Sequence, residues 1–165
     1  MTTSTVGNEM NRIHNRAGFT AIELAVVMGV ILLMVGLTLP AISRSMRKGR
    51  LAESVNTFQS MHQQAMSAAQ QYQMTYGVTA SDAIKLEIVQ NSAKKTMEVV
   101  LTTGGPPFTY IIPPTIEAES GFILYTVGTG LPSPSSASFH FQTIDGKDQA
   151  RIFIAASGLT KVESQ

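Results

Sequence analysis

A run of 20 uncharged residues near the amino terminus constrains this chain more than any other feature. The run extends from Leu24 to Ser43 and reads LAVVMGVILLMVGLTLPAIS. At 1.5 Å per residue a helix of this length reaches about 30 Å, which is the thickness of the hydrocarbon core of a bilayer. A core helix of a globular domain usually keeps a polar stripe, whereas this run is apolar all round. The run therefore predicts a helix that crosses a membrane.

The end of the run argues against an ordinary secretory signal peptide. Such a signal has an apolar region of about 7–15 residues, followed by a small-residue cleavage site. The run here is longer, and nothing resembling Ala-x-Ala follows Leu39. We therefore expect the helix to stay in the mature protein. A secreted enzyme that is cut near Ser43 is the alternative.

The basic residues beside the run bear on the orientation of the span. Arg12 and Arg16 precede it. Four more follow it: Arg44, Arg47, Lys48 and Arg50. Taken alone, the positive-inside rule would place the carboxy-terminal body in the cytoplasm. The sequence leaves open whether the four residues contact lipid headgroups, acidic groups of a neighbouring subunit or only the membrane edge.

Glu23 is the only charged residue between Phe19 and Ile42. An acidic side chain inside a bilayer is costly, so its presence suggests a partner. Phe19 precedes it by four residues, which is one helical turn. If the chain were cut between Gly18 and Phe19, the new α-amino group would have a pKa of about 7.7–8.0 and would be mostly charged at pH 7. Ammonium and carboxylate could then neutralise each other. The alternative is an unpaired Glu23 near the headgroups.

The residues around Glu23 resemble the amino-terminal signal of type IV prepilins and type II secretion pseudopilins; they read RAGFTAIEL. In that family a prepilin peptidase cuts after a glycine behind a basic leader and methylates the new terminal residue, commonly phenylalanine. Gly18 and Phe19 match these positions, and Glu23 matches the glutamate that is the fifth mature residue. Pro40 matches a proline that loosens the helix at the twenty-second. The resemblance implies that Glu23 neutralises the terminal amine of an adjacent subunit during assembly.

The resemblance also implies the fold, the location and the partners. The implied fold is α+β, with a long amino-terminal helix packed on an antiparallel β-sheet, as in pilins. The chain divides into a leader (1–18), a membrane-spanning half-helix (19–43), an amphipathic half-helix (44–76) and a sheet domain (77–165). The leader would stay in the cytoplasm and the sheet domain would lie in the periplasm or outside the cell, against the charge count. The implied partners are prepilin peptidase, other pilin or pseudopilin subunits and inner-membrane lipid.

Beyond the basic residues, the apolar positions follow the period of an amphipathic helix. They recur at steps of three and four residues at Leu51, Val55, Phe58, Met61, Ala65, Ala68 and Tyr72. No strong break separates this stripe from the span, so one helix is expected from about Phe19 to Met74. Gly77 would cap its end. The stripe is expected to face a sheet.

From Ile84 onward the sequence indicates strands and turns, because short apolar or alternating runs are separated by Gly, Pro and Asp. An antiparallel sheet that covers the helix stripe is the expected result. The expected strands are 84–89, 96–101, 108–112, 122–127, 138–144, 151–155 and 159–162. The segment 139–162 also resembles the last strands of H-type minor pseudopilins and FimT-like minor pilins. Since major type IV pilins usually carry a disulfide pair and this chain has no cysteine, a minor subunit is implied.

Composition excludes several classes of function. The chain has 12 basic and 11 acidic residues and a formal net charge of +1, so no strong field attracts nucleic acid. The lack of cysteine excludes a disulfide framework, a thiolate nucleophile and a cysteine-ligated metal. His14, His62 and His140 lack the spacing of a metal site. We expect no catalytic residue, no cofactor and no metal.

Some features suggest chemistry only weakly. Gly128-Thr129-Gly130 lacks the following helix that a phosphate loop needs. Asp145-Gly146-Lys147-Asp148 is more typical of a hairpin turn than of a calcium loop. His140 is expected on the outer face of its strand without a partner, and His62 is expected in solvent. A signal-anchored periplasmic binding protein, with an uncleaved helix as its tether, remains the alternative function for the same fold.

Overall fold

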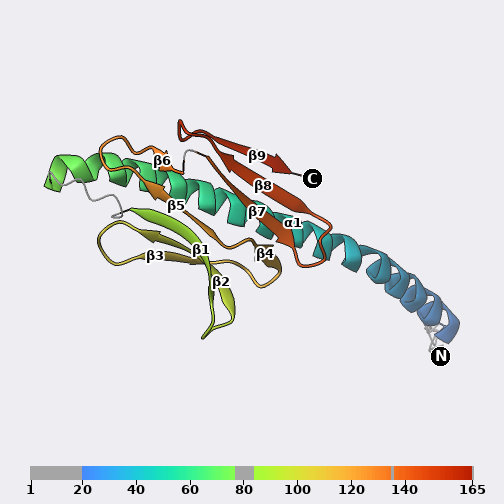
Figure 1. The fold of residues 1–165 in the computed structure, drawn as a ribbon. Coiled ribbons are helices and arrows are strands. Elements are labelled where there is room, and N and C mark those ends of the chain that lie inside the picture. Colours follow the sequence, from blue (N-terminus) through green and yellow to red (C-terminus); the bar gives the residue numbers. More distant parts are fainter. Residues whose placement is uncertain (1–19, 77–83, 135, 165) are drawn as a thin grey trace, which may run out of the picture. The chain divides into compact units, whose positions relative to one another are not determined.

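The computed structural model describes residues 20–76, 84–134 and 136–164, with the side chains of 72–76 left out. The described chain forms a long helix followed by antiparallel strands (Figure 1). It divides into two units after Pro40. The first unit holds the start of the helix, and the second holds the rest of the helix and the strands. The α+β class predicted from the sequence is confirmed.

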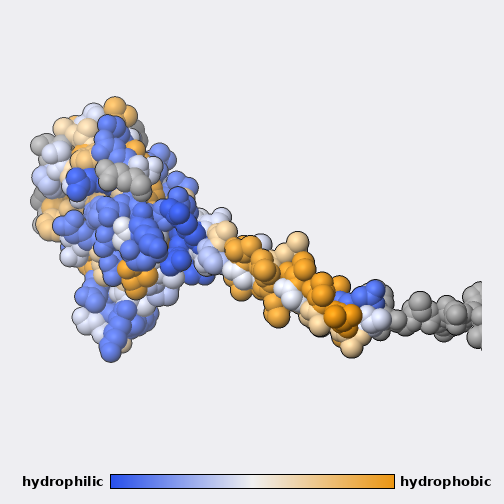
Figure 2. Space-filling view, turned by 90° about the vertical axis from the view of Figure 1, so that its right-hand side faces the viewer, coloured by the Kyte–Doolittle hydropathy of each residue, from blue (hydrophilic) through white to orange (hydrophobic). Residues whose placement is uncertain are grey.

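Helix α1 extends from Ala21 to Tyr76, close to the predicted bounds of Phe19 and Met74. It is long and apolar enough to cross a membrane. The side chains of residues 20–46 are all exposed, and Figure 2 shows apolar side chains gathered on this part of the helix. Gly77, the predicted cap, lies outside the described residues.

Five strands form the first antiparallel sheet, in the order β3-β2-β1-β5-β6. Burial alternates along β1, as expected for a sheet with one face on the core. The strands are β1 (Lys85–Asn91), β2 (Thr96–Thr102), β3 (Phe108–Ile111), β5 (Gly121–Tyr125) and β6 (Pro132–Ser133).

Four strands form a second antiparallel sheet, in the order β4-β7-β8-β9. They are β4 (Ile116–Ala118), β7 (Ala137–Thr143), β8 (Gln149–Ile154) and β9 (Thr160–Ser164). All seven predicted strands exist, with ends that differ by one or two residues in most cases. The structure differs from the single predicted sheet by forming two, and it adds β4 and β6, whose three and two residues are too few to show a period in the sequence.

One hydrophobic core joins α1 to both sheets. Phe58 is fully buried, and its ring centroid lies 4.7 Å from that of Phe139 and 5.7 Å from that of Phe141, both on β7. Such ring pairs add about 0.5–1.5 kcal/mol beyond the burial of their area. The predicted stripe on the helix is therefore the surface on which the sheets pack. Its buried residues are Leu51, Val55, Phe58, Met61, Ala65 and Ala69.

The end of this stripe shifts by one position from the prediction. Ala69 is fully buried, whereas Ala68 is only partly buried. The carbonyl of Ala69 accepts a hydrogen bond of 2.9 Å from the amide of Gly128, which brings the loop after β5 onto this side of the helix. The side chain of Tyr72 lies outside the described part.

His62 is buried, so the expectation of a solvated side chain is wrong. Its exposed fraction is 1%. Nδ1 lies 2.7 Å from the hydroxyl of Tyr125 on β5, and Nε2 lies 2.9 Å from the carbonyl oxygen of Gly158 in the β8–β9 turn. Because a carbonyl only accepts, Nε2 carries the proton and the tyrosine hydroxyl donates to Nδ1. A neutral His62 thus links α1 to both sheets.

The β8–β9 turn is held against α1 beside His62. Gly158 has a φ of +80°, and a Cβ at this position would collide with the side chain of Met66. The positive φ favours glycine here, because other residues adopt it only with strain, and a larger residue would also displace the flexible end of the Met66 side chain. Gln59 also donates to Oγ1 of Thr160 at 3.3 Å. These contacts fix this end of the hairpin to helix residues 59–66.

We predict that the folded chain loses stability as the pH falls below about 6.5. Burial lowers the pKa of His62, and the hydrogen bond to Gly158 offsets this only in part. In the unfolded chain the imidazole titrates near pH 6.5. Below that pH the unfolded chain binds a proton that the folded chain does not, so the free energy of unfolding falls. Thermal unfolding of the full chain in detergent micelles, followed by circular dichroism from about pH 8 to about pH 5, measures this slope.

Two variants identify the group responsible. His62→Leu removes hydrogen bonds to two buried groups, so the free energy of unfolding should fall by about 1–3 kcal/mol at pH 8. The same variant should flatten the slope of stability against pH. Ser54→Ala, a change of a buried group on the same helix that does not titrate, should leave the slope as it is. A slope that survives His62→Leu would contradict this assignment.

Candidate functional site

A capping box between Thr20 and Glu23 closes the first turn of α1. The amide and the hydroxyl of Thr20 both donate to Oε2 of Glu23, each at 2.9 Å. In return, the amide of Glu23 donates to Oγ1 of Thr20 at 3.3 Å. The sequence Thr-x-x-Glu before an apolar run forms this arrangement because it satisfies amides that the start of a helix leaves unpaired. The carboxylate of Glu23 therefore has a defined position.

The capping box engages only one oxygen of Glu23. None of the three hydrogen bonds uses Oε1. Both Thr20 and Glu23 are exposed. The carboxylate can thus accept a further donor without releasing Thr20. The charge of Glu23 marks it in the sequence, whereas Thr20 is not among the predicted site residues, although the Thr-x-x-Glu spacing is the signal that could identify it.

The proposed cleavage site lies outside the described residues. Gly18 and Phe19 both belong to the segment 1–19. Their part in processing stays a prediction, and so does the pairing of Glu23 with a new terminal amine. What the structure adds is that Thr20, the residue after Phe19, holds the Glu23 carboxylate through its backbone amide.

Pro40 lies inside α1, at the last position of the first unit. Proline has no amide to donate to the carbonyl four residues earlier, which weakens a helix at that point. Two residues before it, the hydroxyl of Thr38 donates to the carbonyls of Met34 (3.1 Å) and Val35 (3.2 Å). The helix continues through Pro40. The predicted role of this residue in assembly is a separate question and stays a prediction.

Three of the four basic residues after the span form ion pairs within their own chain. Arg47 lies 3.1 Å from Asp145, and Lys48 lies 3.1 Å from Asp148. Arg44 lies 4.0 Å from Asp148. Both aspartates belong to the turn between β7 and β8. The sequence left open whether these cations contact lipid headgroups or acidic groups of another subunit. In the structure, three of them pair with carboxylates of their own chain.

The β7–β8 turn is built to present these carboxylates. The Thr143 hydroxyl donates to Asp145 at 2.7 Å, and this bond is the main cause that holds the pKa of Asp145 below its usual value. The amide of Lys147 and the charge of Arg47 act in the same direction. Asp148 is 7% exposed and receives two cations from α1. The β7–β8 turn is thus held to α1 at one end of β8, and the β8–β9 turn is held to α1 at the other end.

The hairpin-turn interpretation of residues 145–148 is confirmed. Gly146 has a φ of +65°, and its amide donates to the carbonyl of Thr143 at 2.7 Å. The two carboxylates point to cations of α1. Among the described residues, no group of three or more His, Cys, Asp or Glu side chains is placed to hold a metal.

The other two weak features serve packing. The loop 128–130 lies against α1, where Gln70 donates to the carbonyl of Thr129 at 3.3 Å. His140 lies on the face of β7 opposite Phe139 and Phe141, as predicted. It does have a neighbour, contrary to the expectation, since its Nε2 lies 3.4 Å from Oε1 of Gln149.

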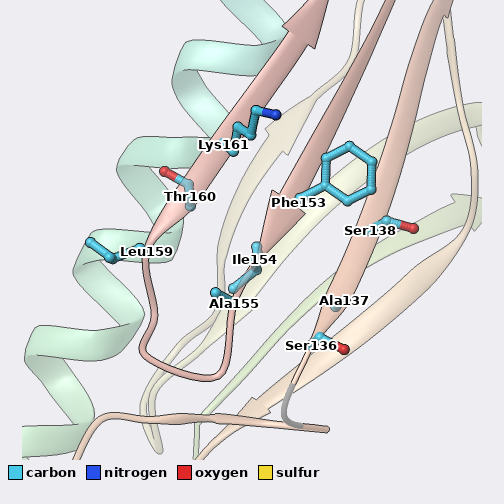
Figure 3. A pocket seen from close by; sticks show the side chains of 9 residues that line it. All are labelled: Ser136, Ala137, Ser138, Phe153, Ile154, Ala155, Leu159, Thr160 and Lys161. Carbon is cyan, nitrogen blue, oxygen red and sulfur yellow. The ribbon is translucent and has the colours of Figure 1, made fainter.

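A groove of about 590 Å³ lies on the outer face of the four-stranded sheet (Figure 3). The ring of Phe153 lies between Ser138 and Lys161, which are its partners on the neighbouring strands. The residues that line it are mostly apolar and include no carboxylate and no imidazole. The groove therefore lacks the pair of groups that acid–base chemistry requires.

Comparisons of this chain with protein-family models, with curated proteins and with solved structures found no match. The resemblance to prepilins thus rests on the motif around Glu23 and on the architecture. That architecture is a long apolar amino-terminal helix whose second part packs on antiparallel sheets, as in pilins.

We predict that Asp148→Asn lowers the free energy of unfolding by about 1.5–3 kcal/mol, because a hydrogen bond to a charged group is worth about that much. Asp148 is nearly buried and faces Lys48 and Arg44. Urea unfolding of the full chain in micelles at low and high salt measures the loss. Lys161→Gln is the control, since the pair of Lys161 with Glu163 is exposed and should contribute nothing measurable. An equal loss of unfolding free energy in the two variants would show that the contact of Asp148 with Lys48 and Arg44 does not stabilise the fold.

Proposed function

We propose that this chain is a structural subunit, a minor pseudopilin or minor pilin, of a type II secretion pseudopilus or a type IV pilus. Prepilin peptidase cuts it after Gly18 and methylates Phe19. The mature subunit is stored in the inner membrane as a single-pass protein with its sheet domain outside the cytoplasm. It then enters a filament through α1. The proposal assigns the chain no catalytic activity, no cofactor and no metal.

The exposed apolar surface of α1 supports this proposal. Fifteen large apolar side chains between Ile22 and Met46 are exposed. Each gains about 1.5–3 kcal/mol on leaving water, so this surface needs a cover. Lipid covers it in storage, and like helices of other subunits cover it in a filament. The free energy of transfer between these two apolar surroundings is small, which allows a subunit to pass from one to the other.

The geometry of Glu23 is the single observation that carries the proposal. The capping box alone would suit any helix, but a carboxylate placed where an apolar span begins is also available to a partner outside its own chain. Here the carboxylate is held by Thr20, next to the proposed new terminus, with Oε1 left to accept a further donor. A terminal ammonium of the neighbouring subunit supplies that donor. Glu23 thereby sets the register between subunits.

Processing is the first prediction to test. Gly18→Leu should block cleavage, because the peptidase in this family requires a small residue before the cut. The intact mass of the protein from native membranes should then exceed the wild-type mass by the 18-residue leader. Gly7→Leu, in the same leader, should be processed normally. A wild-type protein that does not begin at Phe19 would remove the basis of the proposal and favour the signal-anchored binding protein.

The role of Glu23 is the second prediction. Glu23→Val removes the charge and the capping acceptor, whereas Glu23→Gln removes the charge but keeps an oxygen for Thr20. Both variants should insert into the membrane. Both should enter filaments less well, by roughly tenfold or more, because a charge-assisted contact is lost.

Thr20→Val is the matched control, since it removes the hydroxyl of the capping box and leaves the charge. It should retain most incorporation. The readout is the ratio of subunit in sheared filaments to subunit in membranes. If Glu23→Gln assembles like the wild type, the charge has no role in assembly.

A further inference from the structure

We propose that the body of this protein carries a second membrane contact, a surface that binds anionic phospholipid headgroups. It consists of helix residues 44–50 and turn residues 144–148, and we call it the basic turn surface. The proposal rests on the membrane span of the proposed function. It adds a contact between the sheet domain and the bilayer that holds that span.

The position of the turn along the helix carries the first step. Residues 41–43 complete the uncharged run and belong to the same unit as the sheets. The ion pairs of Arg47 with Asp145 and of Lys48 with Asp148 join the β7–β8 turn to α1. Arg47 and Lys48 lie four and five residues after the end of the run at Ser43. Five residues of helix span only about 8 Å. Where residues 41–43 form the end of the span, the β7–β8 turn, which is joined to α1 within about 8 Å of them, is therefore expected at the level of the headgroups.

The charge of this surface carries the second step. Its cations are Arg44, Arg47, Lys48, Arg50 and Lys147. Asp145 and Asp148 are its acids, so five positive and two negative charges leave a net charge of +3. Among the ion pairs of the described residues, Arg50 and Lys147 take part in none. A cluster of cations at the edge of a span attracts anionic lipids.

An apolar side chain at the same place carries the third step. Ile144 begins the turn and is 60% exposed. Its amide donates to the carbonyl of Thr115 at 3.0 Å, which fixes the backbone at this point. Ile144 is thus an exposed apolar side chain in the same turn whose Asp145 and Asp148 pair with the cations of α1. Apolar and cationic side chains on one surface favour binding at the interface between headgroups and acyl chains. Acidic groups of a neighbouring subunit would fit the cations but would give Ile144 no apolar cover.

The absence of cysteine makes a direct test possible, because one introduced cysteine is a unique labelling site. Ile144→Cys places a label on the basic turn surface. Leu159→Cys is the matched control: Leu159 is 74% exposed in the β8–β9 turn, at the other end of β8 (Figure 1). That turn contacts helix residues 59–66, at least 12 residues or about 18 Å beyond Arg47.

The experiment places each labelled full-length variant in nanodiscs with a nitroxide on the lipid headgroups. The discs contain phosphatidylcholine with or without about a third of phosphatidylglycerol. Quenching of the fluorophore should be at least about twofold greater for the Ile144→Cys variant than for the Leu159→Cys variant in anionic discs. This excess should shrink without phosphatidylglycerol and in high salt, which screens exposed charges.

A charge variant adds a second arm in the Ile144→Cys background. Arg50→Gln with Lys147→Gln lowers the net charge from +3 to +1 without touching an ion pair, so quenching should fall. Lys94→Gln with Lys95→Gln makes the same change in the β1–β2 turn and should have no effect. Equal quenching at the two label sites overturns the proposal. So does quenching that ignores both phosphatidylglycerol and the charge variant.

A label in the span separates this proposal from the proposed function. Leu33→Cys, with nitroxides on the acyl chains, reports whether the run enters the bilayer. An inserted span with no headgroup contact at position 144 refutes the basic turn surface and leaves the filament subunit intact. A normal contact in a chain whose leader is never cut refutes the filament subunit alone.

Discussion

The burial of one face of α1 is the constraint on which the second unit depends. Both sheets pack on the same stripe, between Leu51 and Ala69. The ring of Phe58 packs against two rings of β7. His62 hydrogen bonds to Tyr125 in the five-stranded sheet and to Gly158 in a turn of the four-stranded sheet. Because one helix face serves both sheets, a change in the helix stripe disturbs the two sheets together. The helix is thus the common support of the body.

The two parts of α1 meet different surroundings. From residue 20 to residue 46 every side chain is exposed, and beyond residue 50 exposed and buried positions alternate with the helical period. The boundary lies where the cations pair with Asp145 and Asp148. These ion pairs bring the sheet domain up to the point where the uncharged run ends. The ion pairs therefore tie the sheet domain to the first turns of α1 beyond the run.

Much of the fold could be predicted, because the signals that carry it are local. A period of 3.6 residues in the helix, and apolar strands between Gly, Pro and Asp turns, sufficed for the α+β class and seven strands. The strands β4 and β6 escaped, since three and two residues show no period. The partition into two sheets escaped too, because strand order depends on contacts between distant residues. In the candidate site the charge of Glu23 was recognised, but its capping partner Thr20 was not.

The sequence by itself determined the apolar run, the single acid within it and the stripe that seeks a core, since each depends on the order of neighbouring residues. Only the tertiary structure decided which polar side chains pair with other groups of the same chain. It buried His62 between Tyr125 and Gly158, and it paired Arg47 and Lys48 with a turn almost 100 residues away. The physical reason is that a polar side chain can be satisfied by water or by a distant partner. The amino-acid sequence does not specify which of the two it meets.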